Sequence, residues 1–288
     1  MLIDAHLHVF VRPSAKYPRE TDALTPATRE APVEQLLDLM DANGVDKAGL
    51  VQLGGTGLAK HAYLRDCLRR FPGRFAGIGL VDADADDPAR ELDELVEAVG
   101  VKGIRLNYLG DPDEADVTRQ PTYPLWQRLA ERALILWLYP SDDQIPLIEP
   151  FIQAFPSIPV VMNHLGMCPD NFSIDKLARP HIDAEIPPPT LPTILRLARC
   201  SNVYVKLSGQ YGFSHEPYPY RDLRPLVQSL YDAFGADRLL WATDFPWIVE
   251  EPGYDRLVRL LEEQLPSLSA QERARIMGGT AAALFGFQ

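Results

Sequence analysis

The sequence predicts a (β/α)8 barrel, also called a TIM barrel, with residues 1–288 forming a single domain. Short apolar runs of strand length alternate with amphipathic stretches of helix length along the whole chain. The repeat of roughly 30 residues fills the about 250 residues that eight such units need. A doubly wound sheet would instead need a glycine-rich phosphate turn after its first strand, and none follows residues 2–9.

The elements of this barrel can be placed in order. The expected strands cover 2–9, 47–53, 75–81, 101–107, 134–139, 159–164, 203–208 and 239–244. The expected helices cover 32–43, 59–70, 88–99, 124–133, 145–155, 191–200, 223–234 and 254–264. Asp87 and Pro88 suit the N-cap and first turn of the third helix, while Gly44 and Gly235 are expected to end the first and the seventh.

Charge and composition exclude several classes of partner. The chain has 28 Lys and Arg against 40 Asp and Glu, a formal net charge of −12, and it contains no basic run. Phosphate backbones and anionic lipid surfaces need a positive footprint, so we expect no nucleic-acid or membrane partner. The three cysteines lack disulfide or zinc spacing, and no signal peptide is visible, which predicts a cytoplasmic protein. A homo-oligomer is left open.

The first expected strand carries two histidines. Because residues two apart in a strand point the same way, Asp4, His6 and His8 are expected inside the barrel, with Ile3 and Leu7 facing the helices. Polar side chains at the C-terminal end of a barrel strand lie where barrel active sites form. Core histidines satisfied by hydrogen bonds are the structural alternative.

Two more ligand-type side chains end other strands. His164 closes the strand 159–164, and Asp244 closes the strand 239–244. Together with His6 and His8 they are expected at one mouth, where three imidazoles and a carboxylate suit a divalent ion, preferably zinc. Asp244 can then serve as the base for an attacking water. An N-cap or loop salt bridge is an equal alternative for Asp244 taken alone.

Alternation also predicts substrate-side residues. The side chains expected inside their strands are Arg105, Asn107, Tyr139, Lys206 and Ser208. An interior cation is costly unless an anion meets it, so Arg105, with its planar fork, is expected to bind a substrate carboxylate. For Lys206 an internal salt bridge with Asp4 or Asp244 is nearly as favoured as a substrate contact. Trp247 is expected as a pocket wall.

Two long connections, 166–190 and 210–222, border the expected mouth. Loops of this length in a compact barrel are often functional, and the second one is rich in aromatic residues. An aromatic lid over an organic ring is one interpretation. Packing against the barrel rim is the commoner one.

Four segments carry the expected site. They are 3–8 (IDAHLH), 163–166 (NHLG), 205–209 (VKLSG) and 240–247 (LWATDFPW). In order and spacing they resemble the amidohydrolase-related proteins of the amidohydrolase superfamily, and within it the lactonases that act on sugar lactones and on 2-pyrone-4,6-dicarboxylate. The resemblance covers essentially the whole chain. It implies a hydrolase in which His6, His8, His164 and Asp244 surround the reacting carbonyl, with one divalent ion, zinc, as the expected cofactor, although branch members with no metal are known.

The expected reaction is therefore hydrolysis of a lactone or similar cyclic ester. An activated water attacks the carbonyl, Asp244 acts as base and then acid, and the metal or His164 stabilises the oxyanion. A metal-dependent decarboxylase of aromatic or unsaturated acids is the alternative on the same fold, although segment 205–209 argues against it. A non-catalytic barrel that binds a small acid is a third. Lys102 is expected to point away from the interior with Ile104, so no two-metal centre is expected.

Overall fold

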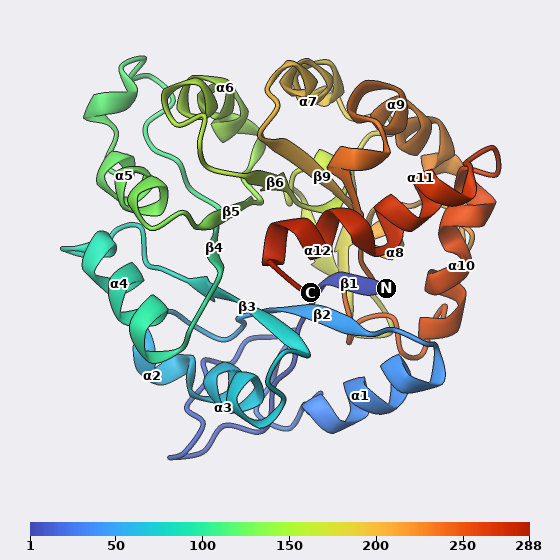
Figure 1. Ribbon diagram of the computed structural model, residues 1–288, viewed down its shortest axis with the longest axis horizontal. Helices are drawn as coiled ribbons and strands as arrows, with labels where there is room; N and C mark the ends of the chain where they lie inside the picture. The colour runs from blue at the N-terminus through green and yellow to red at the C-terminus, as the bar shows by residue number, and fades with distance from the viewer.

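The computed structural model describes residues 1–288 and contains eight parallel strands in a closed barrel (Figure 1). In sheet order the strands are β1 (Ile3–Leu7), β2 (Lys47–Val51), β3 (Phe75–Leu80), β4 (Gly103–Leu106), β5 (Ile135–Leu138), β6 (Val160–Met162), β9 (Val203–Leu207) and β10 (Leu239–Trp241). The amide of Asp244 donates to the carbonyl of His6 (2.9 Å) and the amide of His8 to that of Phe245 (2.7 Å), which closes the last strand on the first. The predicted (β/α)8 fold is confirmed.

Helices surround the barrel and cover one end of it. The outer ring contains α1 (Val33–Ala42), α2 (Gly57–Lys60), α3 (Ala62–Arg70), α4 (Pro88–Ala98), α5 (Tyr123–Glu131), α6 (Ile145–Ala154), α7 (Leu191–Arg196), α9 (Arg224–Phe234) and α10 (Tyr254–Gln264). After α11 (Ala270–Ala274), helix α12 (Thr280–Phe285) crosses in front of the strands in Figure 1. The helix expected over 59–70 is divided at His61 into α2 and α3.

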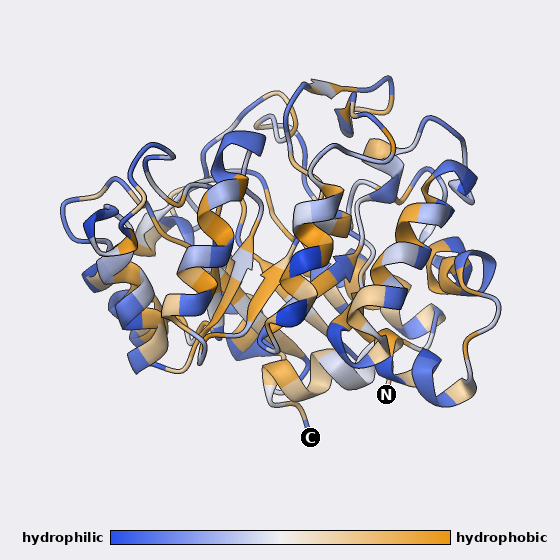
Figure 2. Cartoon of the chain, turned by 90° about the horizontal axis from the view of Figure 1, so that it is seen from above, coloured by the Kyte–Doolittle hydropathy of each residue, from blue (hydrophilic) through white to orange (hydrophobic).

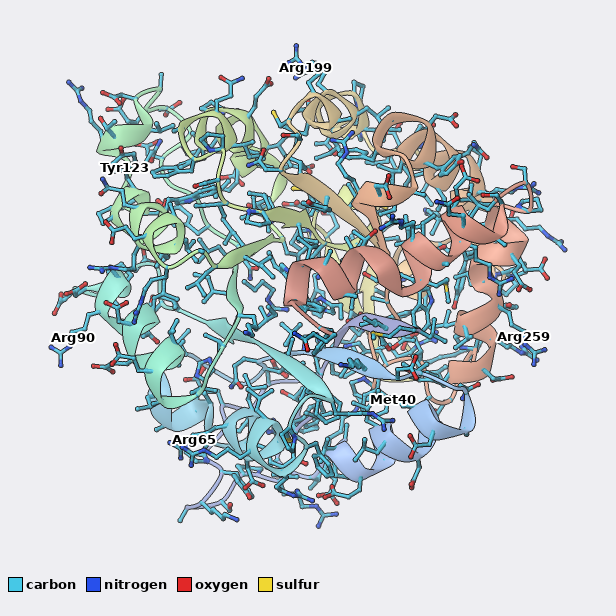
Figure 3. All side chains as sticks on the ribbon, in the orientation of Figure 1. Met40, Arg65, Arg90, Tyr123, Arg199 and Arg259 are labelled. Atoms are coloured by element: carbon cyan, nitrogen blue, oxygen red, sulfur yellow. The ribbon has the colours of Figure 1, made fainter.

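Apolar side chains form two cores, one on each side of the barrel wall. Alternate strand residues pack outward against the helices, and Met40 of α1 is fully buried in this layer (Figure 3). The other strand residues meet inside, where Trp137 and Phe285 of α12 pack together. Figure 2 shows the hydrophobic residues concentrated on the strands and on the inner helix faces. None of the helices has the length and apolar character that crossing a membrane requires.

Strand β1 does not keep the predicted alternation. Its pairing with β2 shifts between Asp4 and Leu7, so that one extra residue is accommodated there. Ile3 and Ala5 therefore join the inner core, whereas Asp4 accepts hydrogen bonds from Thr243 and from Tyr254 of the outer helix α10. The expectation that Asp4 lies inside the barrel and Ile3 outside was wrong. The extra residue in β1 exchanges the inward and outward positions of the residues before His6.

Both long connections contain regular structure at the mouth. In 166–190, β7 (Phe172–Ile174) and β8 (Pro180–Ile182) form an antiparallel hairpin, which lies behind the barrel axis in Figure 1. The second connection begins with the short helix α8 (Gln210–Phe213). Figure 2 shows both chain termini at the opposite end of the barrel from the extended loops. The mouth at the C-terminal ends of the strands is thus built from these loops.

Candidate active site

His6 and His8 lie at the end of β1 with their rings nearly perpendicular. Their Nε2 atoms are 3.2 Å apart, and both side chains are buried. Nδ1 of His8 is 3.0 Å from the carbonyl oxygen of Val51, which only a protonated nitrogen can satisfy. With Nδ1 occupied in this way, the Nε2 atom of His8 is the ring nitrogen that faces His6.

Asp244 completes this cluster from the turn that follows β10. Its backbone is left-handed (φ 63°), a conformation that costs free energy for a residue with a side chain and is typical of functional sites. Oδ2 accepts a hydrogen bond from the hydroxyl of Tyr211 at 2.7 Å. Oδ1 lies 3.5 Å from Nε2 of both His6 and His8, and it is buried with no hydrogen-bond partner. One carboxylate oxygen is thus held in place and the other is available for chemistry.

The local environment keeps Asp244 ionised and the imidazoles of His6 and His164 neutral. Burial by itself would raise the pKa of Asp244, but interactions with His164, His8 and Tyr211 outweigh it and leave the pKa below its usual value. Burial lowers the pKa of His164 to about 4 and that of His6 far below its usual range. A carboxylate beside neutral rings can accept a proton near neutral pH.

His164 approaches the cluster from the end of β6. Its own φ is 43°, again left-handed, and its Nδ1 lies 2.9 Å from Oγ of Ser208 on the loop after β9. The ring packs edge-on against His6 at 5.0 Å and against Tyr139 at 4.8 Å. Gly209 leaves room for it, since a Cβ there would lie 2.5 Å from Nδ1 of His164.

Lys206 is fully buried beneath the site and does not line its cavity. Its Nζ lies 2.5 Å from Nδ1 of His6 and 3.3 Å from the centre of the Trp137 ring. Neither Asp4 nor Asp244 forms an ion pair with it, so the internal salt bridge that the sequence left open is absent. Burial, with the nearby charge of Arg105, lowers the pKa of Lys206 far below its usual value. Lys206 contacts His6 at Nδ1, the ring nitrogen that does not face His8.

His6, His8 and Asp244 fit a divalent metal ion. Their ligand atoms all lie within 4.8 Å of one another. The three separations, 3.2, 3.5 and 3.5 Å, are close to the about 3.3–3.4 Å between ligands of a tetrahedral zinc with bonds of about 2.0–2.1 Å. The orphan Oδ1 of Asp244 and the free Nε2 of His8 are the donors that such an ion needs. His164, the fourth expected ligand, lies outside this triangle of donors.

A cavity of about 210 Å³ opens above these groups. Its wall includes His8, His164 and Asp244 together with four of the expected substrate-side residues, Arg105, Asn107, Tyr139 and Trp247. Nε of Arg105 is buried without a hydrogen-bond partner, and Asp244 is the only acidic residue in the wall. The cavity therefore combines an ionised carboxylate that has one free oxygen with an unpaired guanidinium.

The connections 166–190 and 210–222 were expected to border the mouth, but neither the β7–β8 hairpin nor the contact of Tyr211 with Asp244 was predicted. Tyr211 stands on α8 directly after the left-handed Gly209, and the guanidinium of Arg179 lies 5.3 Å from its ring centre. In the sequence Tyr211 was one of several aromatic residues in a loop. The sequence contained one local signal of a turn toward the mouth. This is Gly209, which follows Ser208 at the end of the expected strand 203–208.

Comparison with protein families gives the context of this arrangement. The family model for amidohydrolases matches residues 3–287, almost the entire chain. The chain belongs to the amidohydrolase family. The candidate site of this amidohydrolase lies where the four family-like segments converge at the C-terminal ends of the strands.

Several relatives of this amidohydrolase carry the names of lactone hydrolases. It is 27% identical to a 4-sulfomuconolactone hydrolase of Hydrogenophaga intermedia, over 98% of this chain and 88% of that protein. It is 27% identical to an L-fucono-1,5-lactonase of Burkholderia ambifaria, over 85% of this chain and 80% of that one. A solved structure of a proposed 2-pyrone-4,6-dicarboxylic acid hydrolase from Pseudomonas putida is 28% identical and superimposes with a TM-score of 0.74, covering 100% and 98% of the two chains.

Proposed function

We propose that this amidohydrolase opens a small lactone or similar cyclic ester by hydrolysis. The observation that carries the proposal is the divided role of the Asp244 carboxylate, with Oδ2 held by Tyr211 and Oδ1 unpartnered in the cavity wall. Such a group can take a proton from a water and return it to a leaving alkoxide. The names of the relatives support lactones as the substrate class.

The side chains divide the steps between them. The carboxylate of Asp244 accepts a proton from the attacking water, and the protonated carboxyl then donates it to the ring oxygen as the acyl–oxygen bond breaks. We assign the Ser208 hydroxyl, 2.9 Å away, as the donor to Nδ1 of His164, which places the proton of the neutral ring on Nε2. We assign this N–H to the developing oxyanion, because His164 lines the cavity beside Asp244.

We further propose that one divalent ion, zinc, is held by His6, His8 and Asp244. When bound, such an ion polarises a carbonyl oxygen and lowers the pKa of a nearby water. The position of the His6 ring supports this assignment, since its Nδ1 contacts Lys206 and its Nε2 faces Nε2 of His8 and Oδ1 of Asp244. Metal content measured by elemental analysis, and activity before and after chelation, test it directly.

Arg105 and Asn107 are proposed to bind an anionic group of the substrate. Arg105 is the cavity cation without a carboxylate partner, and a planar guanidinium pairs well with a carboxylate or sulfonate. Tyr139 and Trp247 are proposed to flank the ring. Cytoplasmic localisation stays part of the proposal, supported by the three free cysteines.

A product assay tests the reaction class. The protein is incubated with a panel of anionic and neutral lactones and, separately, with aromatic carboxylic acids, and both ring-opened acid and CO₂ are measured. We expect ring opening of at least one anionic lactone and no CO₂. Loss of CO₂ from an aromatic acid, with every lactone left intact, would show that the protein is a decarboxylase.

A further inference from the structure

The cavity has two chemically different sides. The strand ends and α8 supply its polar groups, namely Asp244, His8, His164, Arg105, Asn107, Tyr139 and Tyr211. The hairpin β7–β8 supplies only Phe172, Pro180 and Ile182, none of which has a polar side-chain atom. A ligand that fills the cavity therefore meets hydrogen-bonding groups at one end and apolar surface at the other.

Phe172 is the unusual residue on the apolar side. Its side chain lines the cavity yet is 50% exposed, and the only other exposed large hydrophobic residues are Met1, Tyr108 and Ile174. It is paired across the hairpin with Ile182, which is 3% exposed and lines the same wall. A bound molecule that covers Phe172 would remove this apolar surface from water, which favours binding.

The hairpin is held in place by side chains outside the cavity. Arg29 donates to the carbonyl of Ala178 at 2.5 Å, and Arg179 donates to the carbonyl of Glu251 at 2.6 Å. Arg179 also pairs with Asp175 inside the hairpin at 2.8 Å. Phe172 is thus presented from an anchored support, so little ordering is needed when a ligand covers it.

We propose that Phe172 is a specificity-determining residue that selects lactones with an apolar, unsaturated ring edge or substituent over polyhydroxylated sugar lactones. The inference rests on the proposed lactone hydrolysis and refines its substrate class. A hydroxyl placed against Phe172, Pro180 and Ile182 would lose its hydrogen bonds to water without gaining a side-chain partner, and that desolvation disfavours binding. The anionic group would lie at the opposite end, near Arg105.

The test compares two carboxylated lactones of equal ring size, one with an unsaturated hydrocarbon substituent and one with hydroxyl groups. Wild-type protein and the variants Phe172→Ala, Phe172→Leu and Ile174→Ala are assayed for kcat and KM. Ile174 is the matched control, because it stands on the same strand, is 37% exposed and does not line the cavity.

We expect wild type to prefer the unsaturated lactone. Phe172→Ala should lower kcat/KM for the unsaturated lactone about three- to tenfold, mainly through a higher KM. It should change kcat/KM for the hydroxylated lactone less than about twofold. Phe172→Leu should restore most of the preference, and Ile174→Ala should keep it. Equal losses for both substrates in Phe172→Ala, or a wild-type preference for the hydroxylated lactone, would overturn the inference while leaving lactone hydrolysis intact. A wild type that opens neither lactone would instead overturn the proposed function.

Discussion

Replacing Tyr211 by Phe removes a single hydrogen bond from the proposed base. The Tyr211 hydroxyl donates to Oδ2 of Asp244 at 2.7 Å, and burial raises the pKa of Tyr211 far above its usual value, so the phenol stays a donor throughout the working pH range. Phe keeps the ring that packs beneath Arg179. The substitution therefore changes the electrostatics of Asp244 with little change in packing.

The direction and size of the effect follow from this contact. Asp244 must be ionised to accept a proton, so activity falls as the pH drops below the pKa of Asp244. The Tyr211 bond stabilises the carboxylate and lowers that pKa, and its loss moves the acidic limb of the pH profile to higher pH. A hydrogen bond to a charged group is worth about 1.5–3 kcal/mol, which corresponds to about ten- to a hundredfold in the ionised fraction on that limb.

The assay is kcat/KM of Tyr211→Phe against pH, with a lactone that wild type opens. We expect a loss of about ten- to a hundredfold on the acidic limb and near wild-type values on the plateau. Tyr220→Phe is the control, since Tyr220 is a buried tyrosine near the same loop that makes no hydrogen bond to Asp244. An unshifted limb would refute the reasoning, and an equal loss at every pH would assign Tyr211 to substrate binding instead.

Three further substitutions test other parts of the account. Gly209→Ala places a Cβ 2.5 Å from Nδ1 of His164 at a left-handed position. We expect a large loss of kcat with only a small decrease in the melting temperature, measured by parallel kinetic and thermal unfolding experiments. Arg105→Met should raise KM for anionic lactones about tenfold or more and leave neutral lactones unaffected, and equal effects on both would contradict an anion-binding role. Burial raises the pKa of Asp4 to about 6 from 3.8, so the native state keeps a proton that the unfolded state releases, and wild-type stability should fall as the pH rises through this window. Asp4→Asn should lack that fall, which amounts to at most about 3 kcal/mol, and urea unfolding from pH 4 to 7 compares the two curves.

The sequence predicted the parts of the site that depend on strand periodicity. His6, His8, His164 and Asp244 stand at strand ends, and parallel strands bring such ends to one mouth whatever the details of packing. The reversal at Asp4 could not be predicted, because a one-residue shift between strands leaves no local mark in the apolar pattern.

The contacts that tune the site come from loops and from long-range packing. Tyr211 reaches Asp244 because Gly209 turns the chain left-handed, and the hairpin closes the cavity because Arg29 and Arg179 bind backbone carbonyls that are distant in sequence. For Lys206 the sequence weighed a substrate contact against an ion pair. The structure shows neither of these contacts. Lys206 lies instead between His6 and Trp137, and this position depends on three strands that meet only in the folded barrel.

The most direct test of the central claim is hydrolysis of an anionic lactone in ¹⁸O-labelled water by wild type and by Asp244→Asn. Attack of water on the carbonyl predicts one labelled oxygen in the new carboxylate of the product, and loss of the base predicts a rate about 10²–10⁴-fold lower in the folded variant. Asn keeps the size of the side chain and an oxygen that can still accept from Tyr211. Undiminished ring opening by Asp244→Asn, or a product with no label in the carboxylate, would contradict the account.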